Sequence, residues 1–380
     1  MQRVLILGGG FGGIAAARRL RQTLSPEDEI LLVDRREHFM VGFRKTWALV
    51  GESSLEAGQR RLAALERQGI QVVRGPITAI DPVARAGEVD GRRIEADAMI
   101  VALGAELAPE QVPGFQLYAF NIYDPHDIPR AAAALREFRD GRVAIGIFGV
   151  PYKCPPAPYE MALLVKDFFR ARDVDAALEI FTPQPMSLPI LGQAGCDIIE
   201  GRLAENGITF LPNHKATAVE AGEVLFASGR RPYDVLLGVP PHRCPAVVSH
   251  SGLTDGGNWV RVNSRTLETK FPGVYAIGDT VEVLMADGKP LPKAGVFAEA
   301  MGEVVAERIA ATFARQEPAA VFEGEGGCYL EVGSGEAMMV RGRFLAEPAP
   351  SVTLTEPSRA YLEEKRAFEA ERLQTWFSEV

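Results

Sequence analysis

A glycine-rich loop near the N-terminus restricts the fold of this chain more than any other feature. Residues 4–7 predict a short apolar strand, residues 8–13 form the loop, and a helix rich in Ala, Leu and Arg runs to about Leu24. A second apolar strand, residues 30–33, ends at Asp34. An acidic residue about 20 positions after such a loop is typical of a dinucleotide-binding βαβ unit. The loop fits the pattern G-x-G-x-x-G, with Gly8, Gly10 and Gly13 as its glycines.

Further apolar segments extend this first unit. Residues 71–73 and 94–105 predict strands, and much later residues 273–279 predict another, ending in Gly-Asp. A long amphipathic helix is expected over residues 296–314. We therefore expect a discontinuous dinucleotide-binding domain, made of residues 1–107 and 243–310.

The inserted segment, residues 108–242, has its own strand–helix–strand pattern over residues 143–148, 159–170 and 178–181. This pattern predicts a second Rossmann-like domain. Residues 311–380 predict a small α+β unit with Cys328, two strands and a charged final helix. The expected fold class is α/β, with two Rossmann-like domains, the second degenerate, and a small C-terminal α+β domain.

The second domain is degenerate because its phosphate-binding loop is replaced. The loop after residues 143–148 carries Cys154 together with Pro151, Pro155 and Pro156. Proline has no N–H group to donate to a phosphate. The next strand also lacks a terminal acid, since Glu179 lies inside it and is expected on the surface.

Composition excludes several classes of protein. The net charge of −9 disfavours nucleic acid and strongly anionic membranes as partners. No apolar run approaches the roughly 18 residues that span a bilayer. A strand beginning almost at Met1 leaves no room for an export signal, so we expect a cytoplasmic protein, at most peripheral on the cytoplasmic membrane. Four cysteines are too few for a disulfide scaffold, and none of the five histidines has metal-ligand spacing, so no metal is expected.

The order of these motifs resembles the pyridine nucleotide-disulfide oxidoreductase superfamily. Within it, the chain is most similar to the sulfide:quinone oxidoreductases and to the flavoprotein subunit of flavocytochrome c sulfide dehydrogenase. The segments that carry the resemblance are 8–13, 153–160, 239–243, 251–254, 275–279, 292–295 and 327–329. The Cys-Pro-Pro segment and the late Cys-Tyr are the specific ones.

The resemblance implies FAD as the cofactor. The positions that would hold it are Gly8, Gly10, Phe11, Gly12, Gly13, Asp34, Arg35, Ile77, Ala102, Gly104, Gly278, Asp279, Lys293, Ala294 and Gly295. Lys293 and the N-terminus of the following helix would stabilise negative charge on reduced flavin. In the flavocytochrome subunit a cysteine attaches FAD covalently. Here Gly42 is the nearest match, so we expect noncovalent FAD.

The resemblance also implies that Cys154 and Cys328 form a redox-active pair over the flavin. Lys153 is expected to favour the thiolate of Cys154. Glu160 matches a carboxylate proposed as an acid/base in this family, although it could equally serve the helix dipole. Cys196 and Cys244 lack a motif and are expected to be structural.

We therefore expect an FAD-dependent sulfide dehydrogenase that passes two electrons to a quinone or similar acceptor. Its substrate would be sulfide or polysulfide. The expected catalytic residues are Cys154, Cys328, Glu160 and Lys293. Two alternatives stay open. One is a single-subunit NADH:quinone oxidoreductase, and the other is a noncatalytic flavin-binding subunit for electron transfer or redox sensing. The sequence also leaves open a weak peripheral membrane contact through Trp376 and Phe377, and a homo-oligomeric state.

Overall fold

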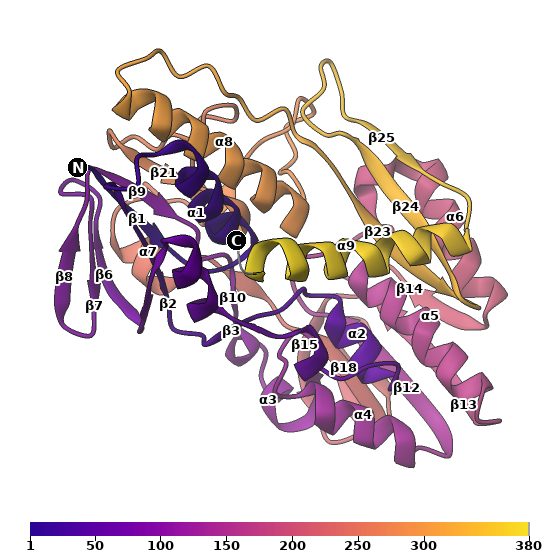
Figure 1. The fold of residues 1–380 in the computed structure, drawn as a ribbon. Helices are drawn as coiled ribbons and strands as arrows, with labels where there is room; N and C mark the ends of the chain where they lie inside the picture. The colour runs from indigo at the N-terminus through magenta and orange to yellow at the C-terminus, as the bar shows by residue number, and fades with distance from the viewer. Residues whose placement is uncertain (379–380) are drawn as a thin grey trace.

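The computed structural model describes residues 1–378 and contains two parallel sheets, as expected (Figure 1). The first sheet has the order β21-β9-β1-β2-β5. Its strands are Val274–Ala276 (β21), Ala98–Val101 (β9), Arg3–Leu7 (β1), Glu29–Asp34 (β2) and Gln71–Arg74 (β5). Strand β21, far along the chain, pairs with β9 and so completes the N-terminal sheet.

Two helices cross each other on this sheet, α1 (Phe11–Thr23) and α8 (Gly295–Phe313). They pack closely because glycines face each other. A Cβ atom on Gly302 would lie 2.3 Å from the carbonyl oxygen of Gly12. The central strands beneath are mostly apolar, as buried parallel strands are, with residues 4–7 fully buried.

The second sheet has the order β11-β18-β12-β13-β14. Its strands are Phe120–Asn121 (β11), Val235–Val239 (β18), Asp140–Ile147 (β12), Asp175–Phe181 (β13) and Ile208–Leu211 (β14). Its helices are α4 (Ile128–Glu137), α5 (Ala157–Arg170) and α6 (Gly192–Glu205). The chain passes from the first sheet to the second and later returns. The two passing segments pair with each other as a short antiparallel ladder, β10 (Glu106–Leu107) with β19 (His242–Arg243).

Smaller elements surround these sheets. Two antiparallel three-stranded sheets are formed by Ile77–Asp81 (β6), Ala86–Val89 (β7) and Arg92–Glu95 (β8), and by Ala216–Glu220 (β15), Glu223–Phe226 (β16) and Gly229–Pro232 (β17). Short helices are α2 (Arg44–Leu49), α3 (Phe115–Tyr118) and α7 (Ala246–His250). The remaining short strand pairs are β3 (His38–Phe39) with β4 (Arg60–Arg61), and β20 (Val260–Arg261) with β22 (Val281–Glu282).

The C-terminal unit is a three-stranded sheet followed by a long helix. The strands are Glu325–Gly333 (β23), Glu336–Arg343 (β24) and Ser351–Leu354 (β25), and the helix is Arg359–Phe377 (α9). Helix α9 crosses the front of the molecule between the two parallel sheets (Figure 1). The domain boundaries given above stay a prediction.

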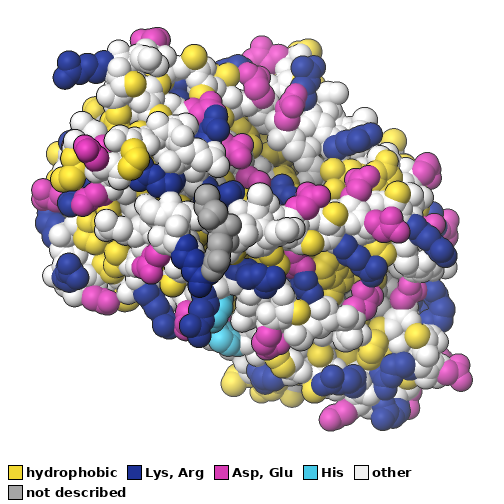
Figure 2. Space-filling model, viewed as in Figure 1, with side chains coloured by type: hydrophobic (Ala, Val, Ile, Leu, Met, Phe, Trp, Pro, Cys, Tyr) yellow, Lys and Arg dark blue, Asp and Glu magenta, His cyan; other side chains and the backbone are white. Residues whose placement is uncertain are grey.

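Helix α9 packs on its own chain. Trp376 and Phe377 are buried against the rings of Phe11 and Phe39. The two side chains through which the sequence leaves a weak bilayer contact open are therefore covered by their own chain. Within residues 1–378, no helix is both long and apolar enough to cross a membrane. Positive, negative and apolar side chains are interspersed over the face shown in Figure 2, without a patch of one sign.

Candidate active site

The glycine loop leaves an open cradle at the N-terminus of α1. Gly8 has φ +113°, and a Cβ atom on it would lie 2.3 Å from the carbonyl oxygen of Ala102. A Cβ atom on Gly13 would lie 1.8 Å from the carbonyl oxygen of Gly8. A Cβ atom on Gly10, in contrast, would meet nothing within 4 Å. Open space beside a glycine at a helix N-terminus suits a pyrophosphate, so these residues fit the ADP half of a dinucleotide.

Asp34 lies beside this cradle and is ionised. Its carboxylate accepts a hydrogen bond from the N–H of Gly9 at 2.7 Å and is paired with Arg36 at 2.7 Å. Burial opposes its charge, but the hydrogen bonds and charge of Arg36 outweigh burial and hold the pKa of Asp34 below its ordinary value. The cation that pairs with the acid is thus Arg36, and the neighbouring Arg35, a predicted cofactor-binding residue, is exposed like Arg36.

The N-termini of α1 and α8 meet at the same place. A Cβ atom on Gly295 would lie 2.9 Å from the ring of Phe11, so this glycine lets the two termini approach. Gly12 serves the same packing, because a Cβ atom there would lie 2.8 Å from the carbonyl oxygen of Ala298. Two helix N-termini that converge are suited to hold an anionic group.

Lys293 precedes α8 and is buried. Its ammonium donates to the carbonyl oxygens of Asp279 at 2.7 Å and Val281 at 3.1 Å, and lies 3.5 Å from the ring centre of Trp259. Burial lowers the pKa of Lys293 to about 8. The other predicted positions here are the N-cap Ala294 and two glycines with positive φ, Gly104 and Gly278. Ile77 is partly buried at the start of β6.

The cysteine loop is tied to the Lys293 segment. The N–H of Cys154 donates to the carbonyl oxygen of Lys293 at 2.7 Å, and Lys153 forms a parallel bridge with Lys293. The hydroxyl of Tyr123 donates to the carbonyl oxygen of Cys154 at 3.2 Å. Both backbone polar groups of Cys154 are therefore occupied, and its φ of +53° is held by these contacts. The hydrogen bonds of the Cys154 backbone to Lys293 and Tyr123 therefore fix the position of its thiol.

Cys154 and Cys328 are far apart in the sequence, but the charge of one acts on the other, and both are free thiols. Burial and then the charge of Glu160 raise the pKa of Cys154 to about 11. Burial and then the charge of Cys154 raise the pKa of Cys328. Lysines favour the thiolate of Cys154, as expected of Lys153, but burial outweighs the charges of Lys365 and Lys45. Two thiolates that repel each other in a buried site favour a disulfide or neutral thiols over the doubly ionised pair.

Three buried charges lie beside the cysteines. Glu160 on α5 and Glu331 on β23 both bind the ammonium of Lys365 on α9, at 2.7 Å and 2.6 Å. Sequence reasoning missed Glu331 and Lys365. Lys365 stands among charged neighbours in the sequence, a pattern typical of a solvated helix face. No local signal could have identified it, since its two partners come from distant segments.

The remaining cysteines are buried away from this pair. The thiol of Cys196 contacts the carbonyl oxygen of Leu188 at 3.1 Å, and burial raises the pKa of Cys244 to about 11. His242 packs edge-on against Tyr123 at 5.5 Å, and burial lowers its pKa to about 3, so it is neutral. Among residues 1–378, no cluster of three or more His, Cys, Asp or Glu side chains could hold a metal ion.

The loop around Cys154 is poorly suited to a second dinucleotide. Its prolines donate nothing, and the N–H of Cys154 is already used. Glu179 is buried rather than on the surface, because Arg142 and Arg231 bind its carboxylate at 3.0 Å and 2.7 Å. The carboxyl end of β13, where an acid would read a ribose, therefore offers no free carboxylate.

Comparisons with known proteins agree with this geometry. A profile described as pyridine nucleotide-disulphide oxidoreductase matches residues 2–146. The mitochondrial sulfide:quinone oxidoreductase of Mus musculus is 24% identical over 363 residues, covering 91% of this chain and 79% of the mouse protein. The type II NADH:quinone oxidoreductase of Staphylococcus aureus is 23% identical, covering 81% of this chain and 82% of that protein.

Among solved structures, the X-ray structure of the sulfide:quinone oxidoreductase from Aquifex aeolicus superposes with a TM-score of 0.89 at 22% identity. The alignment covers 99% of this chain and 92% of that one. The fold therefore agrees over the whole length.

These findings define the class first. Residues 2–146 match the model of the pyridine nucleotide-disulphide oxidoreductases, and the chain is a flavin-dependent oxidoreductase. Over most of its length it is similar to sulfide:quinone oxidoreductases.

Proposed function

We propose that this chain is an FAD-dependent sulfide dehydrogenase that works through the Cys154–Cys328 pair and delivers two electrons to a quinone. The observation that carries the proposal is that Cys154 stands where a second dinucleotide loop would otherwise lie and that its charge acts on the remote Cys328. The relatives named for sulfide and quinone support the same substrate and acceptor.

The chemistry starts with the sulfide anion. HS⁻ attacks one sulfur of a Cys154–Cys328 disulfide, that cysteine keeps the incoming sulfur, and the other leaves as a thiolate. The cations near Cys154 favour the approach of an anion, because Lys45 and Lys153 both interact with its charge. Glu160 lies next to the pair and can accept a proton there.

The residues that would hold noncovalent FAD are those of the glycine cradle, Asp34, and the Asp279–Lys293 segment. When bound, FAD supplies a two-electron acceptor for the thiolate and a donor for the quinone. Lys293 and the N-terminus of α8 would stabilise the negative charge that accompanies reduction.

Relatives of this chain also include NADH:quinone oxidoreductases, which favours that alternative. This chain, however, lacks the second nucleotide-binding loop that such an enzyme needs. The prolines of the Cys154 loop and the ion pairs of Glu179 argue against NADH binding. We therefore expect NADH and NADPH to reduce the flavin poorly.

Anaerobic stopped-flow measurement of flavin bleaching tests the proposal. Sulfide should bleach the flavin of the wild-type enzyme rapidly, while NADH should not. Cys154→Ser and Cys328→Ser should each abolish bleaching by sulfide with FAD still bound. Cys196→Ser and Cys244→Ser are the matched controls and should bleach normally. Wild-type rates in either of the first two variants, or rapid bleaching by NADH, would contradict the proposal.

The acceptor is tested separately on sulfide-reduced enzyme. A short-chain quinone should reoxidise the flavin quickly and cytochrome c slowly. The reverse order of rates would replace the quinone by a cytochrome.

A further inference from the structure

The buried charges beside the cysteines form a compact, unbalanced cluster. The side chains of Glu160, Glu331 and Lys365 are 3%, 3% and 1% exposed. Besides Lys365, Glu160 accepts a hydrogen bond from the N–H of Glu331 at 2.9 Å. Two carboxylates share one ammonium, so the cluster carries one excess negative charge when both acids are ionised. A buried excess negative charge favours the uptake of one proton.

The inner end of this cluster faces the redox cysteines. Glu160 stands in the first turn of α5, directly after the Cys154 loop, and its charge acts on the thiols of both Cys154 and Cys328. Burial, together with the charge of Glu331, raises the pKa of Glu160, although Lys365 opposes this. Glu160 can therefore hold a proton released beside the cysteines.

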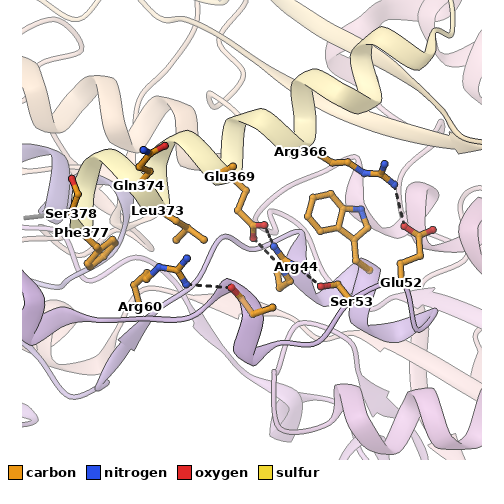
Figure 3. Close-up of a pocket in the computed structure, with 13 residues that line it drawn as sticks. Arg44, Glu52, Ser53, Arg60, Arg366, Glu369, Leu373, Gln374, Phe377 and Ser378 are labelled. Atoms are coloured by element: carbon orange, nitrogen blue, oxygen red, sulfur yellow. Dashed lines mark hydrogen bonds and ion pairs between the residues drawn. The ribbon is translucent and has the colours of Figure 1, made fainter.

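The outer end of the cluster is Glu331, which lies next to a cavity of about 650 Å³ between α2 and α9. The indole N–H of Trp47, which lines this cavity, donates to Glu331 at 2.6 Å. Glu52 lines the same cavity, and burial together with the charge of Glu331 raises its pKa. In Figure 3, Glu52 and Arg366 lie at one end of the cavity, and Arg44 pairs with Glu369 in the middle.

We propose that Glu160, Lys365 and Glu331 form a proton path from the cysteine pair to this cavity, with Glu52 as its outer group. The inference rests on the proposed function. When HS⁻ attacks, the Cys154–Cys328 bond breaks, a bond to the incoming sulfur forms, and one cysteine leaves as a thiolate. The new persulfide loses its proton to Glu160. One HS⁻ and one disulfide thus give a persulfide anion, a thiolate and a proton, and the electron pair of the thiolate goes on to flavin and quinone.

Lys365 connects the two acids. Its ammonium can give a proton to Glu331 while it takes one from Glu160, because it contacts both carboxylates. Lys365 reaches the cysteines only through Glu160, so its part is to carry the proton onward without touching the reacting sulfurs. The charged and titratable groups that face this path from the surrounding elements are Lys45, Arg44, Glu52, Asp167, Cys154, Cys328, Arg366 and Glu369.

The test measures the pH profile of flavin reduction by sulfide in the FAD-loaded enzyme. Glu331→Gln removes the charge that raises the pKa of Glu160, so the acid limb of the profile should move to lower pH while the limiting rate falls by ~10-fold or more. A purely structural defect would not shift this limb downward.

Glu52→Gln provides a variant that should fold normally, because this side chain is 42% exposed. It should slow reduction by sulfide, raise the solvent deuterium isotope effect, and be rescued by formate, which is small enough to enter the cavity. Reduction by dithionite, which bypasses the cysteines, should be unchanged. Glu363→Gln, which changes an exposed acid on α9, is the matched control and should behave as wild type.

The outcomes separate the two proposals. If sulfide does not reduce the wild-type flavin, the proposed function and the proton path both fall. The other outcome is that sulfide reduces the flavin of the wild-type enzyme and of both variants, Glu331→Gln and Glu52→Gln, with the same rates and pH profiles. In that case only the proton path is overturned.

Discussion

Replacing Lys365 with methionine should destabilise the protein more than any surface charge change on α9. The substitution keeps a long side chain but leaves Glu160 and Glu331 buried against each other without a cation. It also removes an ammonium lying 4.9 Å from the ring centre of Phe43. Breaking a buried ion pair by removing one partner costs about 3–5 kcal/mol.

This free energy converts into a shift of Tm. At ~2.1 cal/mol/K per residue, a chain of 380 residues has an unfolding entropy of about 0.8 kcal/mol/K. We therefore expect Lys365→Met to lower Tm by about 4–6 °C in differential scanning calorimetry. The matched control is Arg366→Met, whose side chain is 58% exposed and lies 3.7 Å from Glu52. Loss of this surface pair should cost at most about 1 kcal/mol, or roughly 1 °C.

The pH dependence gives a second check on the same variant. Without the ammonium, the folded-state pKa of Glu160 rises further, so the folded variant binds a proton more tightly than the unfolded chain. Its stability is then lost as pH rises through the raised pKa and recovered as pH falls. The Tm difference from wild type should therefore be smaller at about pH 5.5 than at about pH 8. A difference no larger than that of Arg366→Met, or one that grows on acidification, would refute the reasoning.

Three further predictions concern the cofactor and the thiols. Acid or heat denaturation should release intact FAD, because Gly42 stands where a covalent attachment would need cysteine; flavin left on the precipitated chain would contradict this. Burial raises the pKa of Cys154 to about 11. Alkylation of the reduced enzyme by iodoacetamide should therefore speed up about tenfold per pH unit from pH ~8 to ~10. A plateau of the rate near pH ~8 would show an ordinary thiol and contradict this. Lys293→Met should lower the flavin midpoint potential by about 30 mV or more in a dye-equilibrated titration, because it removes a cation from the flavin edge. The exposed control Lys289→Met should leave the potential unchanged. An unchanged potential in Lys293→Met would show that Lys293 does not have this role.

Local pattern was sufficient to predict most of the fold. The apolar strands and the helix after the glycine loop formed within a few residues of their expected limits, for example α1 at Phe11–Thr23 and β13 at Asp175–Phe181. The return of the chain to the first sheet was also predicted, and β21 pairs with β9 as required. These predictions succeed because periodicity, glycine spacing and proline placement act over short stretches of backbone.

Buried charge was what local pattern could not predict. Glu179, Lys365 and Glu369 all read as solvated residues in their own segments, yet all three are buried. The buried face of α9 has regular helical spacing, but two of its positions are charged.

By itself, the sequence determined the two dinucleotide-type units, the loss of the second phosphate loop and the two cysteines that the resemblance singles out. Only the tertiary structure decided which charges meet beside those cysteines. The physical reason is that a charged side chain is stable in the interior only when a partner reaches it. For Lys365 these partners are Glu160 and Glu331, which stand on α5 and β23 and approach it only when the chain is folded.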